Sequence, residues 1–117
     1  MKENKLIDLS KMFAVDIVNL CTDIKENRKG NVLLNQLLRS GTSIGANVAE
    51  AERGKTRADF HAKMNIALKE AGETKYWLNL LHDSNYLTTA EFKSMEKDID
   101  EIIAILVSIC KKTQKTK

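Results

Sequence analysis

Apolar residues recur every three or four positions along most of this 117-residue chain, and no proline interrupts them. This spacing places the apolar side chains on one face of an α-helix, and the residue that most often breaks a helix is missing. The chain has only five glycines and few aromatic residues, and its β-branched residues form no alternating runs. Strand signals are therefore weak, and the pattern predicts an all-α protein with long helices.

Four segments carry such an apolar stripe. The expected helices cover about residues 5–27, 32–53, 57–82 and 89–111. The expected core positions are Leu6, Leu9, Phe13, Ile17, Leu20 and Ile24; Leu34, Leu37, Gly41, Ile44, Val48 and Ala51; Phe60, Met64, Ala67, Ala71, Leu78 and Leu81, flanked by Leu68 and Trp77; and Phe92, Met95, Ile99, Ile102, Leu106 and Ile109. The clearest helix start is the fourth, where Thr88 and Glu91 have the spacing of a capping box.

Amphipathic helices with short connections bury their stripes by packing against one another in alternating directions. The predicted fold class is therefore all-α, an antiparallel up-down-up-down four-helix bundle. We expect one domain over residues 1–117, with a short basic tail at 111–117 that frays.

The second segment contains the run Ser40-Gly41-Thr42-Ser43-Ile44-Gly45, which is poor helix material because each internal glycine costs about 1 kcal/mol relative to alanine. Either a loop breaks the helix here, or the small residues let a neighbouring backbone approach closely. Gly41, Gly45 and Ala49 are spaced by four and form one ridge. This spacing favours a continuous helix with close packing.

Both cysteines, Cys21 and Cys110, fall on apolar faces, where a free cysteine packs as a small hydrophobic residue. The alternative is a disulfide between the first and last helices, which needs Cα atoms about 6 Å apart. We favour buried free thiols in a reducing cytosol. No segment resembles a signal peptide or the roughly 20 apolar residues that span a bilayer. The sequence predicts a cytoplasmic protein with no membrane partner.

The sequence contains none of the common motifs of catalytic or metal-binding sites. The chain lacks a glycine-rich phosphate loop, paired cysteine couplets for zinc and a His-Glu-x-x-His motif. Bundle di-iron sites use Glu-x-x-His pairs, but the residues three before His61 and His82 are Ala58 and Asn79. Ser43 and His61 could be imagined as nucleophile and base, yet their spacing builds no triad. We expect a non-enzymatic protein with no metal, no cofactor and no catalytic residue.

A polar stripe follows the second helix at steps of four, four and three residues. Its members are Arg39, Ser43, Asn47 and Glu50. The stripe is either a solvated face or part of a hydrogen-bonded network, in which Arg39 or Asn47 meets Glu50 and also Glu73 of the third helix. Such a network fixes helix register or a subunit contact. The residues alone leave both interpretations open.

Basic residues gather at one end of the predicted bundle, because an up-down topology brings the second connection beside both termini. They are Arg53, Lys55, Arg57, Lys111, Lys112, Lys115 and Lys117, together with Lys2 and Lys5. Glu50, Glu52 and Asp59 partly offset them. The net charge of +3 permits nucleic-acid contact without requiring it. This end is either solubilising charge or a phosphate-binding surface, and without interleaved aromatic residues such binding has little sequence preference.

Five motifs together are similar to those of a known family. They are QLLRSGTSIGANVAEA at 36–51, DF at 59–60, NIALKEA at 65–71, ETKYWL at 73–78 and NYLT at 85–88. The chain resembles the four-helix bundle protein family, whose members are encoded in intervening sequences of 23S ribosomal RNA genes and elsewhere in bacterial genomes. Two positions depart from the family pattern, since Ala51 and Asn85 stand where the family usually has glycine.

The resemblance implies a four-helix bundle and, in some relatives, a ring-like homopentamer. Related accessory proteins of diversity-generating retroelements form basic pentameric rings that bind a reverse transcriptase and nucleic acid. Our leading hypothesis is a non-enzymatic, self-associating bundle that binds RNA or DNA through its basic end without strong sequence preference, with a protein partner as a further expectation. The alternative is a protein–protein interaction adaptor with no nucleic-acid role.

Overall fold

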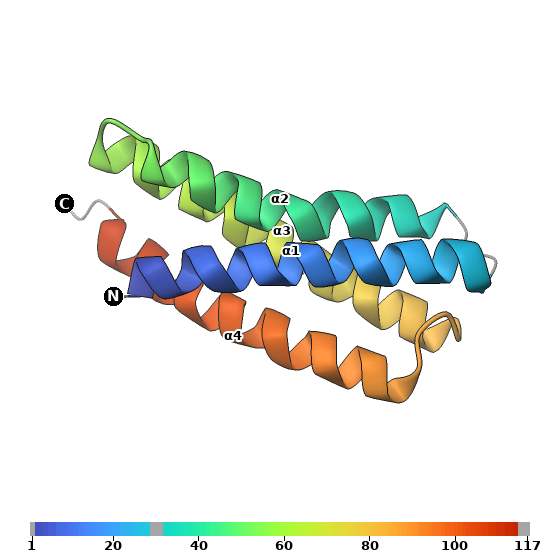
Figure 1. Ribbon diagram of the computed structural model, residues 1–117. Coiled ribbons are helices and arrows are strands. Elements are labelled where there is room, and N and C mark those ends of the chain that lie inside the picture. The colour runs from blue at the N-terminus through green and yellow to red at the C-terminus, as the bar shows by residue number, and fades with distance from the viewer. Residues whose placement is uncertain (1, 29–31, 115–117) are drawn as a thin grey trace.

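Four helices form an elongated bundle in the computed structural model, which describes residues 2–28 and 32–114 (Figure 1). They are α1 (Lys2–Asn27), α2 (Leu33–Glu52), α3 (Arg57–Asp83) and α4 (Thr89–Thr113). Successive helices run in opposite directions, and the bundle measures 49 × 22 × 20 Å. Each helix packs against the next one in the chain. The α4 helix also packs against α1, and this contact is the least extensive of the four. The predicted all-α, up-down-up-down fold is confirmed.

The expected core stripes of α2 and α4 are buried at every position. The expected stripe of α1 is partly wrong, because Leu9 and Leu20 are only half-buried while Ser10 and Cys21 are fully buried. The Ser10 hydroxyl donates to the Ile7 carbonyl of its own helix at 3.2 Å, so its burial leaves no polar group unsatisfied. A hydrophobic pattern cannot reveal such a residue in advance.

The α3 stripe departs from the expectation in the same way. Phe60 is half-buried, while Thr74 lies in the core and donates its hydroxyl proton to the Glu70 carbonyl at 2.8 Å. A threonine that satisfies its own hydroxyl on the preceding turn packs like a β-branched apolar residue.

The α2 helix runs without interruption through its two glycines, so the alternative of a loop is wrong. A Cβ atom added at Gly41 would lie 2.9 Å from the Ile17 side chain of α1, and one added at Gly45 would lie 3.3 Å from the backbone oxygen of Ser10. These glycines therefore let α1 and α2 approach closely, and the close-packing interpretation is confirmed.

The connection from α3 to α4 turns at Asn85, whose φ of 68° is left-handed. The Tyr86 N–H donates to the Leu81 carbonyl at 2.8 Å, and the Asn85 N–H donates to the His82 carbonyl at 3.0 Å. These two bonds form a Schellman motif, which usually has glycine at the left-handed position. The α4 helix then begins with the predicted capping box, in which Thr88 and Glu91 exchange bonds of 3.0 and 3.1 Å.

Replacing Asn85 with glycine is expected to raise the free energy of unfolding by a few tenths of a kcal/mol, while Asn85→Ala lowers it by about 1 kcal/mol. Thermal and urea unfolding followed by circular dichroism measure both changes. Ser84→Gly is the matched control, because Ser84 has a φ of −92° and glycine there only adds unfolded-state entropy. A gain in stability from Asn85→Ala would contradict the left-handed assignment.

The two cysteines lie at opposite ends of the bundle, so the alternative of a disulfide between them is wrong. Cys21 faces the Leu34 carbonyl beside the α1–α2 connection. Cys110 belongs to the last turns of α4, which meet the start of α3. Both thiols are free and buried, and burial raises the pKa of each, that of Cys21 to about 11.

None of the described helices combines the length and apolar character needed to cross a bilayer.

Candidate nucleic-acid interface

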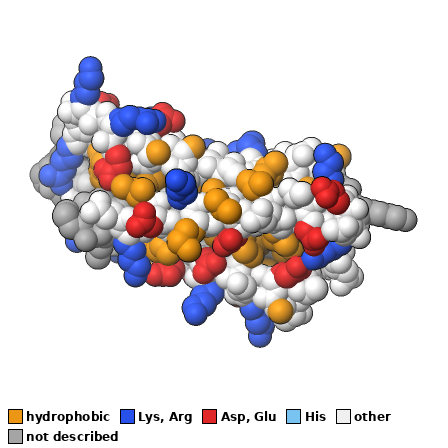
Figure 2. All heavy atoms as spheres, viewed as in Figure 1, with side chains coloured by type: hydrophobic (Ala, Val, Ile, Leu, Met, Phe, Trp, Pro, Cys, Tyr) orange, Lys and Arg blue, Asp and Glu red, His pale blue; other side chains and the backbone are white. Residues whose placement is uncertain are grey.

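The basic end is built from three elements that meet beside the start of α1. Arg53 follows α2, Lys55 lies in the next connection, and Arg57 begins α3, with all three exposed. Lys111 and Lys112 project from the last turn of α4 and are also exposed. Figure 2 shows Lys and Arg side chains at the end of the molecule where Figure 1 marks the two chain ends. The structure thus brings together the described members of the predicted basic cluster.

The last turn of α4 is ordered against α3, so the expectation that the tail frays from Lys111 is wrong for its first three residues. The Arg57 guanidinium donates to the Lys112 carbonyl at 2.5 Å. His61 Nδ1 lies 2.7 Å from the Thr113 hydroxyl, which itself donates to the Ile109 carbonyl at 2.9 Å. The imidazole nitrogen therefore acts as the donor in the His61–Thr113 bond. Lys115, Lys117 and the side chain of Lys2 lie outside the described residues.

Four of the described cations at this end make no ion pair with a described carboxylate. Within residues 2–28 and 32–114, neither Arg53, Lys55, Lys111 nor Lys112 makes an ion pair. Lys5 at the same end is paired with Glu101 at 3.1 Å, and away from this end Lys75 is paired with Asp100 at 2.6 Å. Part of this charge has a structural role, because cations at the end of α4 complement its helix dipole. The same role applies to Arg53, which caps the C-terminal end of α2, but not to Lys55 in the connection.

Two of the expected offsetting carboxylates, Glu52 and Asp59, are exposed at the same end. The third, Glu50, binds Lys63 of α3 at 3.0 Å, so it is already neutralised along the side of the bundle. The end consequently keeps an excess of positive charge.

The polar stripe of α2 divides into separate contacts. Arg39 donates to Glu73 at 2.8 Å and to Glu70 at 3.1 Å, which joins α2 to α3. The Asn47 amide donates to the Ser43 carbonyl of its own helix at 2.9 Å. Arg39 does not meet Glu50, so the structure joins Arg39 to Glu73 but leaves the stripe without one continuous network.

Sequence reasoning missed a cluster around Arg28, at the opposite end from the basic cluster. The Arg28 guanidinium donates to Glu91 at 2.6 and 2.7 Å, to Asp23 at 2.7 Å and to the Tyr86 carbonyl at 3.2 Å. The hydrogen bonds from Arg28 hold the pKa of the Glu91 carboxyl well below its usual range, at about 2. Arg28 and Glu91 are too far apart in sequence for any local pattern to pair them.

Neither histidine lies among potential metal ligands. The ring of His82 stacks on Phe92 with the ring centres 4.4 Å apart, and His61 is bonded to Thr113. In the described part of the chain, no three residues of the histidine, cysteine, aspartate and glutamate types are grouped as a metal site requires.

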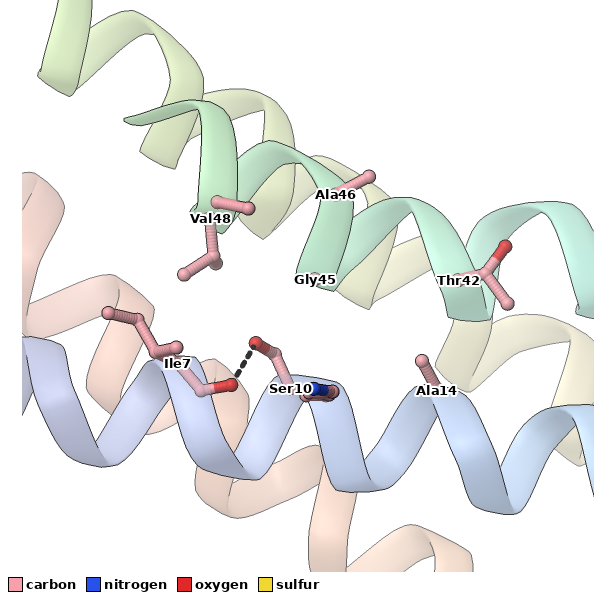
Figure 3. Close-up of a pocket in the computed structure, with 9 residues that line it drawn as sticks. Ile7, Ser10, Ala14, Thr42, Gly45, Ala46 and Val48 are labelled. Carbon is pink, nitrogen blue, oxygen red and sulfur yellow. Dashed lines mark hydrogen bonds between the residues drawn. The ribbon is translucent and has the colours of Figure 1, made fainter. Parts of the chain in front are cut away.

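An apolar groove follows the seam between α1 and α2, and we call it the α1–α2 groove. Its first hollow is lined by Ile7, Ser10, Lys11, Ala14, Thr42, Gly45, Ala46, Val48 and Ala49. Its second hollow is lined by Val18, Cys21, Thr22, Lys25, Leu34, Asn35 and Leu38. Figure 3 shows Ser10 of α1 and Gly45 of α2 where the two helices meet at the first hollow, and Figure 2 shows apolar side chains exposed on this face of the molecule.

Residues 2–108 match the family model described as 23S rRNA-intervening sequence protein. This chain belongs to that family.

The family resemblance seen in the sequence extends to the structure. The 23S rRNA-intervening sequence protein family motif at 36–51 lies on α2, where Gly41 and Gly45 contact α1 and Arg39 contacts α3. A crystal structure of a protein of unknown function from the S23 ribosomal protein family of Bacteroides thetaiotaomicron is 51% identical, with a TM-score of 0.93. The match covers 95% of this chain and 99% of the other.

The comparison with curated proteins gives no match. Neither the family description nor that of the Bacteroides structure names a catalytic activity.

Proposed function

We propose that this chain is a self-associating helical bundle that binds RNA or DNA through its basic end without strong sequence preference. One observation carries the nucleic-acid part: five exposed cations converge from three elements, and four of them make no ion pair within the described residues. Unpaired lysines and arginines that neutralise phosphates release counterions, which is the main source of sequence-independent affinity.

The same end offers little means of reading bases. Among the described residues at this end, the rings of Phe60 and His61 are both half-buried, so neither offers a fully exposed face on which a base could stack. Arg57, which could form a bidentate base contact, donates to the Lys112 carbonyl. The end is thus suited to phosphate contacts. Because a few such contacts bind weakly, self-association strengthens the interaction by repeating the basic end in each copy.

Replacing Lys111 and Lys112 with glutamine is expected to weaken binding to single-stranded RNA roughly 10²-fold at ~50 mM salt, because each lost phosphate contact removes about 0.7–0.9 from the salt slope. Fluorescence polarisation of a labelled RNA over a salt series measures both the affinity and the slope. Circular dichroism confirms that α4 stays folded in the variant. Labelled DNA, single-stranded and duplex, is titrated in parallel.

The matched control is Lys93→Gln with Lys97→Gln, which removes the same charge from exposed positions nearer the start of the same helix. This control is expected to leave the salt slope unchanged. An equal loss in both double variants would show that binding follows net charge and not the basic end. Absence of binding by the wild-type chain at low salt would remove the nucleic-acid role altogether.

The second candidate function is a protein–protein adaptor. The observation that favours it is a set of exposed apolar side chains on α1, since Met12, Val15 and Val18 are 63%, 51% and 44% exposed. Large exposed apolar patches mark contact surfaces for polypeptides. Charge would then serve solubility alone, so the adaptor predicts no nucleic-acid binding at any salt concentration.

A further inference from the structure

Three exposed cations of the basic end stand at two opposite corners of the bundle. Arg53 directly follows α2, while Lys111 and Lys112 belong to the last turn of α4. Among the described helices, α2 packs against α1 and α3, and α4 packs against the same two, but α2 and α4 do not contact each other. These two helices are therefore diagonal in the cross-section of the bundle. We call Arg53 the α2 corner, and Lys111 with Lys112 the α4 corner.

Helix packing sets the distance between the two corners. The axes of neighbouring packed helices lie about 8–10 Å apart, so the diagonal of a square of four helices is about 11–14 Å. The bundle measures 22 × 20 Å perpendicular to its long axis, so both corners fit on one end face. Lysine and arginine side chains are long and flexible, and they reach beyond the helix that carries them.

The corner spacing matches the major groove of duplex DNA. This groove is about 12 Å wide in B-form DNA, whereas the minor groove is about 6 Å wide. Two positive groups about 11–14 Å apart can thus contact phosphates on both sides of the major groove at once, and those phosphates belong to different strands. The minor groove is too narrow for this contact. Duplex RNA does not offer the same spacing, because its A-form major groove is deep and narrow.

A single strand fits the two corners less well. Its phosphates belong to one flexible chain, so reaching both corners requires that chain to be ordered across the end. Proteins that bind single strands usually offset this cost by stacking bases on aromatic rings, but the described rings at this end, those of Phe60 and His61, are half-buried. A DNA duplex holds its phosphates in a regular array at about twice the linear charge density of one strand. The end is therefore better suited to a duplex.

Contacts within the chain hold the two corners in place. The Arg57 guanidinium donates to the Lys112 carbonyl, which ties the α4 corner to the start of α3. The Arg53 N–H donates to the Glu50 carbonyl at 3.0 Å, so the α2 corner continues the backbone of its helix. The two groups therefore keep a fixed spacing, as recognition of a fixed groove width requires.

The other charges at this end modify its affinity without changing the spacing of the corners. Lys55 is exposed in the connection from α2 to α3 and makes no ion pair with a described carboxylate. Glu52 and Asp59 are exposed carboxylates at the same end, and they repel phosphates. Lys5 of α1 is already paired with Glu101 at 3.1 Å. We therefore expect weak binding by each copy, with a steep dependence on salt.

We propose that the basic end binds duplex DNA across its major groove, with the α2 corner on the phosphates of one strand and the α4 corner on those of the other. Contacts of this kind go to the sugar-phosphate backbone and not to base edges, in agreement with binding that has little sequence preference. The inference rests on the nucleic-acid binding that is part of the proposed function. It adds the preferred ligand, which is duplex DNA over single strands and over duplex RNA.

Competition measured by fluorescence polarisation tests this preference. The probe is a short labelled DNA duplex, and the competitors are the unlabelled duplex, each of its strands alone and an RNA duplex of the same sequence. All competitors are compared at equal phosphate concentration. The DNA duplex is expected to compete about tenfold better than either strand or the RNA duplex, because only the DNA duplex brings phosphates to both corners at once.

Charge-neutral variants test each corner separately. Arg53→Gln removes the α2 corner, and Lys111→Gln with Lys112→Gln removes the α4 corner. Each change is expected to reduce the advantage of the duplex over single strands from about tenfold to about twofold or less, because one of the two strands then loses its contact. Circular dichroism checks that the helical content of each variant is unchanged.

Blocking one groove at a time tests where the duplex is contacted. A duplex whose cytosines carry glucosylated hydroxymethyl groups has a filled major groove, and it is expected to bind several-fold more weakly than the unmodified duplex. Netropsin occupies the minor groove of an A·T-rich duplex and is expected to leave the affinity unchanged. The two probes thus separate contact across the major groove from contact across the minor groove.

The outcomes separate this inference from the proposed function. A duplex advantage that both corner variants lose, and that the control variants Lys69→Gln and Lys93→Gln with Lys97→Gln keep, supports the inference. These three lysines are exposed on α3 and α4 away from the basic end. Equal competition by duplex DNA and by single strands or duplex RNA, or a loss of binding caused by netropsin and not by glucosylation, overturns the inference and leaves nucleic-acid binding standing. A wild-type chain that binds no nucleic acid at low salt overturns both.

Discussion

Arg28→Gln is expected to lower the free energy of unfolding by about 2–3 kcal/mol at neutral pH. The Arg28 guanidinium joins the end of α1 to the capping box of α4 and to the connection before it, through bonds to Glu91 and the Tyr86 carbonyl. The side chains of Arg28 and Glu91 are only 29% and 30% exposed, so solvent screens their pairing less than that of a surface pair. Urea unfolding followed by circular dichroism measures the loss.

The ion pair of Arg28 and Glu91 makes the free energy of unfolding depend on pH. The pKa of Glu91 is about 2 in the folded chain, below its ordinary value of 4.5. A carboxyl whose pKa is lowered by folding contributes stability that is fully present above its unfolded pKa and is lost as the pH falls through its folded pKa. Wild-type stability should therefore decrease between about pH 4.5 and pH 2 in part through this group. Glu91→Gln should remove that part of the decrease.

Lys75→Gln is the matched control for Arg28→Gln, because Lys75 and Asp100 form an ion pair at 2.6 Å whose side chains are 39% and 49% exposed. Exposed pairs typically contribute at most about 1 kcal/mol. If Arg28→Gln costs no more than Lys75→Gln, the cluster around Arg28 does not hold the three segments together.

The double variant Gly41→Ala with Gly45→Ala is expected to lower the free energy of unfolding by about 2–4 kcal/mol, although alanine is the better helix former. At Gly41 the new methyl group would lie 2.9 Å from the side chain of Ile17, which is fully buried and would have to shift within the core. At Gly45 it would meet the backbone of Ser10, which moves only if α1 shifts. The two sites are neighbours on one seam, so their costs need not add.

Gly72→Ala is the matched control on α3. A Cβ atom at Gly72 has no neighbour within 4 Å, and no glycine of the described chain has a positive φ. The substitution should raise the free energy of unfolding by about 0.5–1 kcal/mol, the ordinary difference between the two residues inside a helix. Thermal and urea unfolding of the two variants test the packing of α1 on α2. Equal gains in stability would show that this seam is not closely packed.

The sequence alone predicted the helices, their order and the close approach at Gly41 and Gly45, because helical periodicity and small-residue spacing are local signals. It misplaced Leu9 on α1 and Phe60 on α3, because Ser10 and Thr74 satisfy their hydroxyls within their own helices and enter the core as if apolar. Leu20 is half-buried because the neighbouring Cys21 takes the core position. The sequence pattern also placed the start of a frayed tail at Lys111, whereas α4 continues to Thr113. The bond from Arg57 to the Lys112 carbonyl depends on tertiary packing, so no local pattern could reveal it.

The sequence predicted the location of a candidate site only where the order and direction of the helices determine which residues lie together. The basic end follows from the up-down order of the helices, and the structure gathers its described members there. The α1–α2 groove gives no clear sequence signal, because Val18 is an exposed apolar residue in an otherwise ordinary helical pattern. Its shape depends on how α1 packs on α2, which only the packed structure provides.

Self-association is the part of the proposed function that strengthens a weak phosphate-binding surface, and light scattering on the purified wild-type chain tests it most directly. The expected mass is a fixed multiple of 13.2 kDa, with two or more copies in each particle. A mass of 13.2 kDa across the whole concentration range would contradict the account.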